Sequence, residues 1–130
     1  PLFDSVESIA SHLLFSIPAV KGVEFGDGFA VADRRGSENN DPIIDAEGRT
    51  ATNHAGGIDG GITDGNPIVV RVAFKPTPSI HREQQTFDTE TGAIETLQIP
   101  GRHDACIALR GAVVVEAMMA IALTELVLRA

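Results

Sequence analysis

The last apolar stretch of the sequence, Ala112–Leu128, most constrains what this chain can fold into. Its residues would be apolar on nearly every side of a helix, and a helix of that kind is covered by other elements on several faces. Glu116 and Glu125 lie within the stretch, and Arg129 follows it. These charges favour a buried helix of a soluble protein over a membrane span, which needs about 20 predominantly apolar residues. We therefore expect this helix to lie between layers of the fold or in a contact between subunits.

A second helix is predicted near the start of the sequence. Asp4 is followed three residues later by Glu7, which is a capping-box pattern. The apolar residues that follow have helical spacing and predict a helix over about 5–16. Pro18 ends this helix, because the residue before a proline disfavours helical geometry. Val20–Phe25 is then predicted as a short strand.

The clearest strand of the sequence is Ile68–Phe74, in which residues on the two faces alternate. Strand parity places Lys75 on the same side as Arg71, so two cations could leave the sheet together. The stretches 86–89 and 93–99 are predicted to form a hairpin, whereas 33–66 shows no sustained periodicity. The resulting order, α-β-loop-β-β-β-α, is typical of an α+β fold.

Composition limits the class of protein and its partners. A chain of 130 residues fits one domain with a core of its own. The net charge of −8 argues against a nucleic-acid partner and against an anionic membrane surface. The single Cys106 excludes an internal disulfide and fits a reducing compartment, so we expect a cytoplasmic protein. The sequence starts at Pro1, directly before a helix, and we expect it to be part of a longer protein.

The segment Asn53–Gly61 is rich in glycine. Glycines let a backbone come close to a ligand and expose its N–H groups, as flavin and phosphate sites require. The alternative is a glycine-rich turn between strands. The segment lacks the G-x-G-x-x-G spacing of a dinucleotide site. Together with Asp64 it also lacks the spacing of a calcium-binding EF-hand, and we predict no metal site.

The segment Lys75–Ser79 directly follows the clearest strand. Its two prolines each fix φ and remove an N–H donor, which leaves a stiff loop that presents Thr77 and Ser79. A lysine beside hydroxyl groups can bind phosphate or the polar edge of a flavin ring. The alternative is a rigid exit from the strand with no ligand.

The segment Gly101–Asp104 precedes the last helix. Arg102, two residues from Asp104, would favour the ionised carboxylate, which is then ready to accept a proton. The alternative is a surface ion pair that contributes little. A hydrolytic triad of His54, Ser79 and Asp104 can be written down, but the sequence offers no nucleophile elbow to support it.

Taken in order along the chain, these segments resemble chorismate synthase. The resemblance covers nearly the whole sequence and implies that residues 1–130 are the C-terminal portion of a domain whose N-terminal half is absent. The matching blocks are Ile17–Phe29, Arg35–Ser37, Asn53–Gly57, Arg71–Thr77, Gly101–Asp104 and Val115–Met118.

The resemblance implies a fold, a reaction and an assembly. The fold would be the C-terminal part of a layered β-α-β sandwich. The family converts 5-enolpyruvylshikimate 3-phosphate to chorismate by a trans-1,4 elimination of phosphate in the shikimate pathway. It requires reduced FMN, although the reaction has no net redox change, and it usually assembles as a homotetramer.

The resemblance also implies roles for particular residues. Asp104 matches the acid that helps flavin N5 take the ring proton. Asp59, Pro78 and Ala105 depart from the residues usual in the family and put the local contacts of the flavin site in question. The positions that match flavin contacts are Pro18, Ala19, Gly60, Lys75, Pro76, Thr77, Pro78, Ser79 and Arg102.

The family's catalytic histidines and most of its substrate-binding arginines belong to the half that is absent here. The resemblance therefore implies that this chain is inactive by itself. Two other hypotheses stay open. The chain could be a folded, noncatalytic module that keeps the oligomer contacts and binds no flavin, or a flavin-binding protein with different chemistry.

Overall fold

The computed structural model describes residues 1–129. Helices and antiparallel strand pairs occur together, which confirms the predicted α+β class. The elements are α1 (Val6–Ser16), β1 (Val20–Phe25), the 3-10 helix η1 (Gly28–Asp33), α2 (Gly36–Asn39), β2 (Ile58–Asp59), β3 (Ile62–Thr63), β4 (Val70–Phe74), β5 (Gln84–Asp88), β6 (Ala93–Leu97) and α3 (Ala108–Arg129).

Strands β1 and β4 form an antiparallel ribbon that supports the rest of the fold. Val20 is paired with Phe74 at one end and Phe25 with Val70 at the other, with an irregularity between Val20 and Gly22. Along β4 the predicted alternation is confirmed, because Arg71 is exposed while Val70 and its alternate neighbours are partly buried. The strand begins two residues later than predicted.

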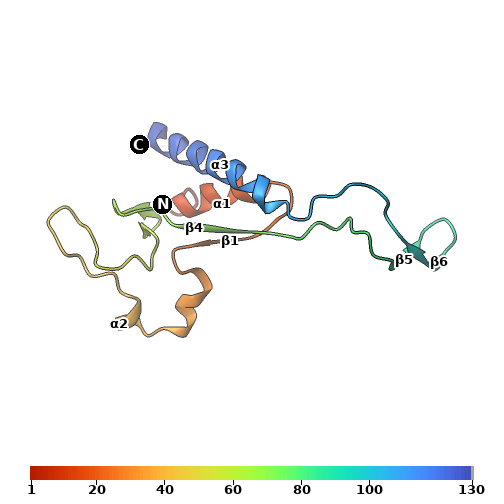
Figure 1. Ribbon diagram of the computed structural model, residues 1–130. Helices are drawn as coiled ribbons and strands as arrows, with labels where there is room; N and C mark the ends of the chain where they lie inside the picture. The colour runs from red at the N-terminus through yellow and green to blue at the C-terminus, as the bar shows by residue number, and fades with distance from the viewer. Residues whose placement is uncertain (130) are drawn as a thin grey trace.

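Helices α1 and α3 lie over one face of this ribbon (Figure 1). The centre of the core is Leu14, Ile17 and Val20, and the apolar side of the ribbon packs against it. The surrounding partly buried residues are Val23, Val70, Val72, Phe74, Val115, Met118 and Met119. The core therefore joins one helical layer to one β layer.

The cap of α1 differs from the prediction by one residue. Ser5 is the N-cap, and its hydroxyl oxygen accepts a hydrogen bond from the Ser8 backbone N–H at 3.1 Å. Ser5 has the extended backbone that an N-cap needs, with φ −66° and ψ 156°. Asp4 is exposed and lies near Arg129 instead.

Helix α3 starts at Ala108, four residues earlier than predicted. The reason is Gly111, which is buried against the ring of Phe74. A Cβ at Gly111 would lie 2.5 Å from that ring, so only glycine permits so close a helix–strand approach. Tertiary packing thus extends the helix through a residue that is intrinsically a poor helix former.

The outer side of α3 is uncovered within residues 1–129. Its buried residues are Gly111 and Ala122, whereas Leu109, Val127 and Leu128 are among its exposed side chains. The helix is long and apolar enough to cross a membrane by length and composition, with a mean hydropathy of 2.0. Helix α3 is therefore covered by other elements on one side only, whereas the prediction placed it between two layers.

The hairpin β5–β6 extends away from the body of the chain (Figure 1). Its strands occupy 84–88 and 93–97, so the first begins two residues before its predicted start. The stretch 33–66, which has no periodicity, contains α2, the short pair β2–β3 and a bridge between Ile43 and Thr50. These pieces are too short for sequence periodicity to reveal.

Candidate functional site

Two segments that match flavin contacts meet at one end of the β1–β4 ribbon. Pro18 and Ala19 precede β1, and Lys75 follows β4. The Lys75 backbone N–H donates to the Ala19 carbonyl oxygen at 2.8 Å, directly beyond the last strand pair. The antiparallel pairing of the strands therefore brings together residues that are distant in the sequence.

Ala19 has a left-handed backbone conformation, with φ 74°. This conformation is unusual for a residue with a side chain and costs about 1–3 kcal/mol. It reverses the chain between α1 and β1, and it points the Ala19 carbonyl at the Lys75 N–H. Strain of this kind persists where the surrounding structure requires it, and functional sites are common places for it.

The loop Lys75–Ser79 presents polar groups that lack protein partners. The Thr77 hydroxyl oxygen is buried and makes no hydrogen bond within residues 1–129. A buried hydroxyl without a partner is costly, and a ligand that bonds to it would remove that cost. Lys75 is exposed and makes no ion pair within the same residues. This loop can therefore receive an anionic or polar ligand.

The loop Gly101–Asp104 lies beside the segment that leads from Ser79 to β5. The rings of His81 and His103 pack with their centroids 5.4 Å apart, which joins the segment after Ser79 to this loop. The His103 Nε2 atom lies 3.4 Å from the Ile99 carbonyl oxygen. The contact of Gly111 with Phe74 places the first turns of α3 over the end of β4.

The predicted pairing of Arg102 with Asp104 is wrong. The Asp104 carboxylate pairs with Arg110, whose guanidinium Nη2 contacts Oδ2. The reason is the early start of α3, which places Arg110 in its first turn, facing back toward the loop. Arg102 is exposed and makes no ion pair within residues 1–129, so its charge stays available for an anion.

Gly60 belongs to a segment that meets the opposite end of the ribbon from Lys75, where the Val69 N–H donates to the Gly56 carbonyl at 3.1 Å. It forms the turn between β2 and β3, and the neighbouring Gly61 carbonyl accepts from the Val6 N–H at the start of α1. Asp59 is exposed at the same turn. The structure therefore brings the segments of Ala19 and Lys75 together at one end of the ribbon and does not bring Gly60 to them.

Two glycines of the Asn53–Gly61 segment are needed for packing within the chain. A Cβ at Gly56 would lie 2.4 Å from the Gly26 backbone nitrogen, and one at Gly57 would lie 2.5 Å from the Pro67 carbonyl oxygen. Both glycines are buried and have positive φ. For these two positions the alternative of a glycine-rich turn is the better interpretation. At Gly60, in contrast, no atom lies within 4 Å of where a Cβ would be.

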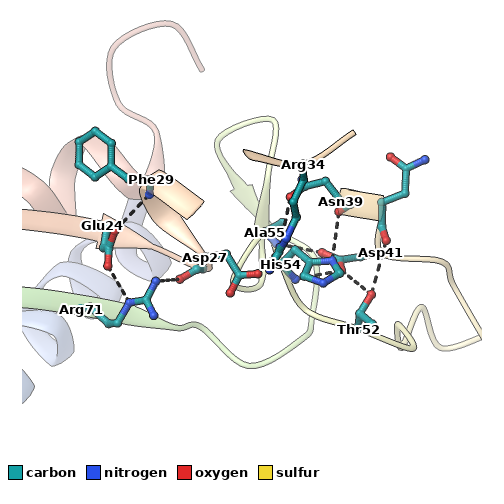
Figure 2. Close-up of polar contacts among 12 residues, drawn as sticks. Glu24, Asp27, Phe29, Arg34, Asn39, Asp41, Thr52, His54, Ala55 and Arg71 are labelled. Atoms are coloured by element: carbon teal, nitrogen blue, oxygen red, sulfur yellow. Dashed lines mark hydrogen bonds and ion pairs between the residues drawn. The ribbon is translucent and has the colours of Figure 1, made fainter. Parts of the chain in front are cut away.

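Asp41 organises the long segment between β1 and β4, and sequence reasoning missed it (Figure 2). Its carboxylate accepts the His54 and Ala55 backbone N–H groups, both at 2.9 Å, and the Thr52 hydroxyl at 2.7 Å. The His54 ring nitrogen Nδ1 lies 2.9 Å from the same carboxylate. No local signal marks these partners, because Asp41 and His54 are joined only by the folded path of the chain.

Burial and hydrogen bonding shift the pKa of Asp41 in opposite directions. Burial raises its pKa, but the hydrogen bonds from two amides and a hydroxyl, with the nearby His54 charge, outweigh burial. The pKa of this carboxyl therefore lies below its ordinary value of 3.8.

Arg71 does not supply the second free cation that strand parity suggested. Its Nε lies 2.8 Å from the Glu24 carboxylate, and its Nη2 donates to the Gly26 carbonyl at 3.2 Å. Figure 2 shows Glu24 between Arg71 and the backbone N–H of Phe29, which donates to it at 3.2 Å. Arg71 therefore joins β4 to the turn after β1, whereas Lys75, directly after β4, makes no ion pair within residues 1–129.

Replacing Asp41 with Asn is expected to loosen the segment around His54. The new side-chain amide would place an NH₂ group against backbone N–H donors, which costs about 1–3 kcal/mol of local stability. Amide exchange at His54 and Ala55 should then be about 5- to 150-fold faster. Hydrogen exchange measured by NMR or mass spectrometry at pH 7 checks this. The control is Asp64→Asn, because within residues 1–129 the exposed Asp64 carboxylate accepts only the Asn66 N–H and the new amide oxygen can still accept it.

The sign of the pH dependence follows from the lowered pKa. As the pH falls, the unfolded chain takes up the proton before the folded chain does, so the stabilisation by Asp41 is complete above about pH 4 and is lost below that value. The variant lacks this titration. The protection of the His54 and Ala55 amides that the variant loses relative to the unmutated protein should therefore become smaller in acid. A loss of protection that is constant from pH 7 to pH 3 would contradict this account of Asp41.

The geometry defines a class of protein first. The described residues form an α+β chain with two exposed cations, Lys75 after β4 and Arg102 before α3, that make no ion pair within residues 1–129. Residues 1–128 match the family model described as chorismate synthase. The chain belongs to the chorismate synthase family.

Individual relatives agree with this assignment. The chain is 59% identical to chorismate synthase of Chitinophaga pinensis over 128 residues, which cover 98% of this chain and 39% of that protein. It is 51% identical to chorismate synthase of Korarchaeum cryptofilum, covering 99% of this chain and 36% of that protein. A crystal structure of chorismate synthase is 46% identical, with a TM-score of 0.54 over 58% of this chain and 23% of that chain. The chain thus spans well under half the length of these relatives.

Proposed function

We propose that this chain is the C-terminal part of a synthase that converts 5-enolpyruvylshikimate 3-phosphate to chorismate and phosphate. The observations that support the proposal are the family match over residues 1–128 and the loop after β4, where Lys75 makes no ion pair and the buried Thr77 hydroxyl makes no hydrogen bond within residues 1–129. The reaction is a trans-1,4 elimination with reduced FMN as cofactor. Asp104 is the residue of this chain that we assign to the chemistry.

The residues at the ribbon end fit a flavin mononucleotide. Lys75 and Arg102 are exposed cations without ion pairs in residues 1–129, and the buried Thr77 hydroxyl lacks a partner. Such groups suit a ligand with a phosphate and a polar ring edge. The contacts would be completed by two segments, with Pro18 and Ala19 before β1 and Pro76, Pro78 and Ser79 after β4. When bound, reduced FMN supplies electron density to an electron-poor intermediate.

The residues of the chain then have separate tasks. The Asp104 carboxylate would serve as a general base for the ring proton that leaves during the elimination. Lys75 and Arg102 hold negative charge that the substrate and cofactor bring into the site. The stiff loop with its two prolines keeps the Thr77 hydroxyl in place without further ordering on binding.

The remainder of the synthase would supply what this chain does not. We propose that it contributes the catalytic histidines and most substrate-binding arginines, and that Gly60 joins the flavin contacts only in the complete assembly. The exposed apolar side of α3 is then covered by protein rather than by lipid, within a cytoplasmic homo-oligomer. Exposed apolar surface of this kind is typical of such interfaces.

A second candidate function is a noncatalytic module that keeps the oligomer contacts and binds no flavin. The uncovered side of α3 favours it, because this surface needs a partner whether or not catalysis occurs. Flavin absorbance of the purified protein separates the two proposals. A flavin-binding protein with other chemistry would be coloured as well, and substrate turnover distinguishes it.

The test uses a completed synthase, in which residues 1–128 replace the matching part of the Chitinophaga pinensis enzyme. We expect it to quench the fluorescence of added FMN and to form chorismate when the flavin is reduced. Lys75→Ala should weaken FMN binding by about 10- to 100-fold, because a hydrogen bond to a charged group contributes about 1.5–3 kcal/mol.

The matched control is Lys21→Ala, since Lys21 is the other lysine of the sequence and is exposed on β1. We expect this variant to bind FMN like the unmutated protein. Equal losses for both lysines would mean that general charge, and not the ribbon end, attracts the flavin. A completed synthase that binds no FMN would favour the noncatalytic module.

A further inference from the structure

The Arg110–Asp104 ion pair connects two structural elements at the ribbon end. Arg110 belongs to the first turn of α3, and its backbone N–H donates to the Ile107 carbonyl at 3.1 Å. Its guanidinium Nη2 contacts the Asp104 carboxylate in the preceding loop. The pair therefore ties the loop that contains the proposed base to the end of a long helix.

The other restraints on this loop act away from the carboxylate. His103 is directed toward the Ile99 carbonyl and the His81 ring, and both contacts hold the imidazole. Arg102 makes no ion pair with Asp104. Within residues 1–129, Arg110 is thus the side chain whose charge holds the Asp104 carboxylate.

The pair is too exposed to matter much for folding. The Arg110 side chain is 75% exposed and that of Asp104 50% exposed, and ion pairs of this kind contribute little to stability. A guanidinium is planar and presents its N–H groups in a fixed fork, so it fixes the direction of a carboxylate better than an ammonium group does. The effect of the pair is therefore on where the carboxylate points.

We propose that Arg110 is a positioning residue that holds the Asp104 carboxylate in the direction required for proton transfer. This inference rests on the proposed function of Asp104. It gives the two arginines around the start of α3 different roles. Arg110 orients the base, and Arg102 is left to bind an anionic ligand. A small misplacement of a reacting group lowers the rate strongly even when binding is unchanged.

The kinetic test compares variants of the completed synthase. Arg110→Ala should lower kcat by about 10- to 100-fold, with little change in KM or in FMN affinity. Arg110→Lys should recover only part of the loss, because it keeps the charge without the planar fork. In an Asp104→Asn background, Arg110→Ala should cause almost no further loss, since its effect passes through the carboxylate. If the two substitutions lowered kcat independently, so that their fold-losses multiplied in the double variant, the proposal would be overturned.

A second measurement does not depend on flavin or turnover. Without FMN, hydrogen exchange of the Gly111 amide, which donates to the Ile107 carbonyl at the end of the loop at 3.0 Å, should be faster in Arg110→Ala than in the unmutated protein. Arg49→Ala is the matched control, because Arg49 is 74% exposed and also forms an ion pair, with Asp45, away from the ribbon end. Unchanged exchange in Arg110→Ala would overturn the proposal. If the unmutated completed synthase has no turnover, the proposed function fails, and the exchange result alone still decides whether Arg110 orders the loop.

Discussion

The 130-residue chain, supplied with 5-enolpyruvylshikimate 3-phosphate and anaerobically reduced FMN, is expected to form no chorismate. Elimination of phosphate requires a proton donor for the leaving group and several cations for a polyanionic substrate. Within residues 1–129, Lys75 and Arg102 make no ion pair, whereas Arg110 is paired with Asp104. These groups are too few to hold the substrate and cofactor together.

Three of the four histidines of this chain are held by contacts within it, and the fourth, His12, is exposed on α1. His54 is bound to Asp41 in the segment before β2, and His103 lies against the Ile99 carbonyl and the His81 ring. The assay measures released phosphate and chorismate absorbance under dithionite, with the completed synthase as the positive control. Turnover of the isolated chain at a rate like that of the completed synthase would refute the proposal that the other part supplies essential groups.

Elements whose pattern is local could be predicted from the sequence. The strand β4 and helix α1 were found because alternation and helical spacing depend only on neighbouring residues. The roles of Lys75, Thr77 and Asp104 followed from a resemblance, and the structure joins Lys75 to Ala19 at one ribbon end. Pairing of β1 with β4 is what converts distant sequence positions into that cluster.

Features that depend on tertiary contacts could not be predicted. The first turn of α3 exists because Gly111 packs against Phe74, a contact that no propensity reports. The first turn of α3 also contains Arg110, the arginine that pairs with Asp104. Because the predicted helix began four residues too late, the sequence analysis paired Asp104 with the wrong arginine. The partners of Asp41 are likewise set by the path of a long loop.

In the completed synthase, Asp104→Asn is expected to lower turnover by about 10²–10⁴, the usual range for a lost general acid or base. Asn keeps the size of the side chain and one acceptor oxygen, but it has neither the charge nor the basicity of the carboxylate. FMN affinity should change much less, because Lys75, Thr77 and Arg102 stay in place. The loss should therefore appear in the single-turnover rate and not in the flavin titration.

Arg102→Ala should show the opposite balance, with weaker FMN binding as its leading defect. Its guanidinium makes no ion pair within residues 1–129, so its removal frees no buried charge and leaves the Arg110–Asp104 pair intact. At saturating reduced FMN, this variant should recover most of its single-turnover rate, whereas Asp104→Asn should not. Normal turnover of Asp104→Asn with saturating reduced FMN would reduce Asp104 to a structural partner of Arg110, because a group that transfers the proton cannot be neutralised without a large loss of rate.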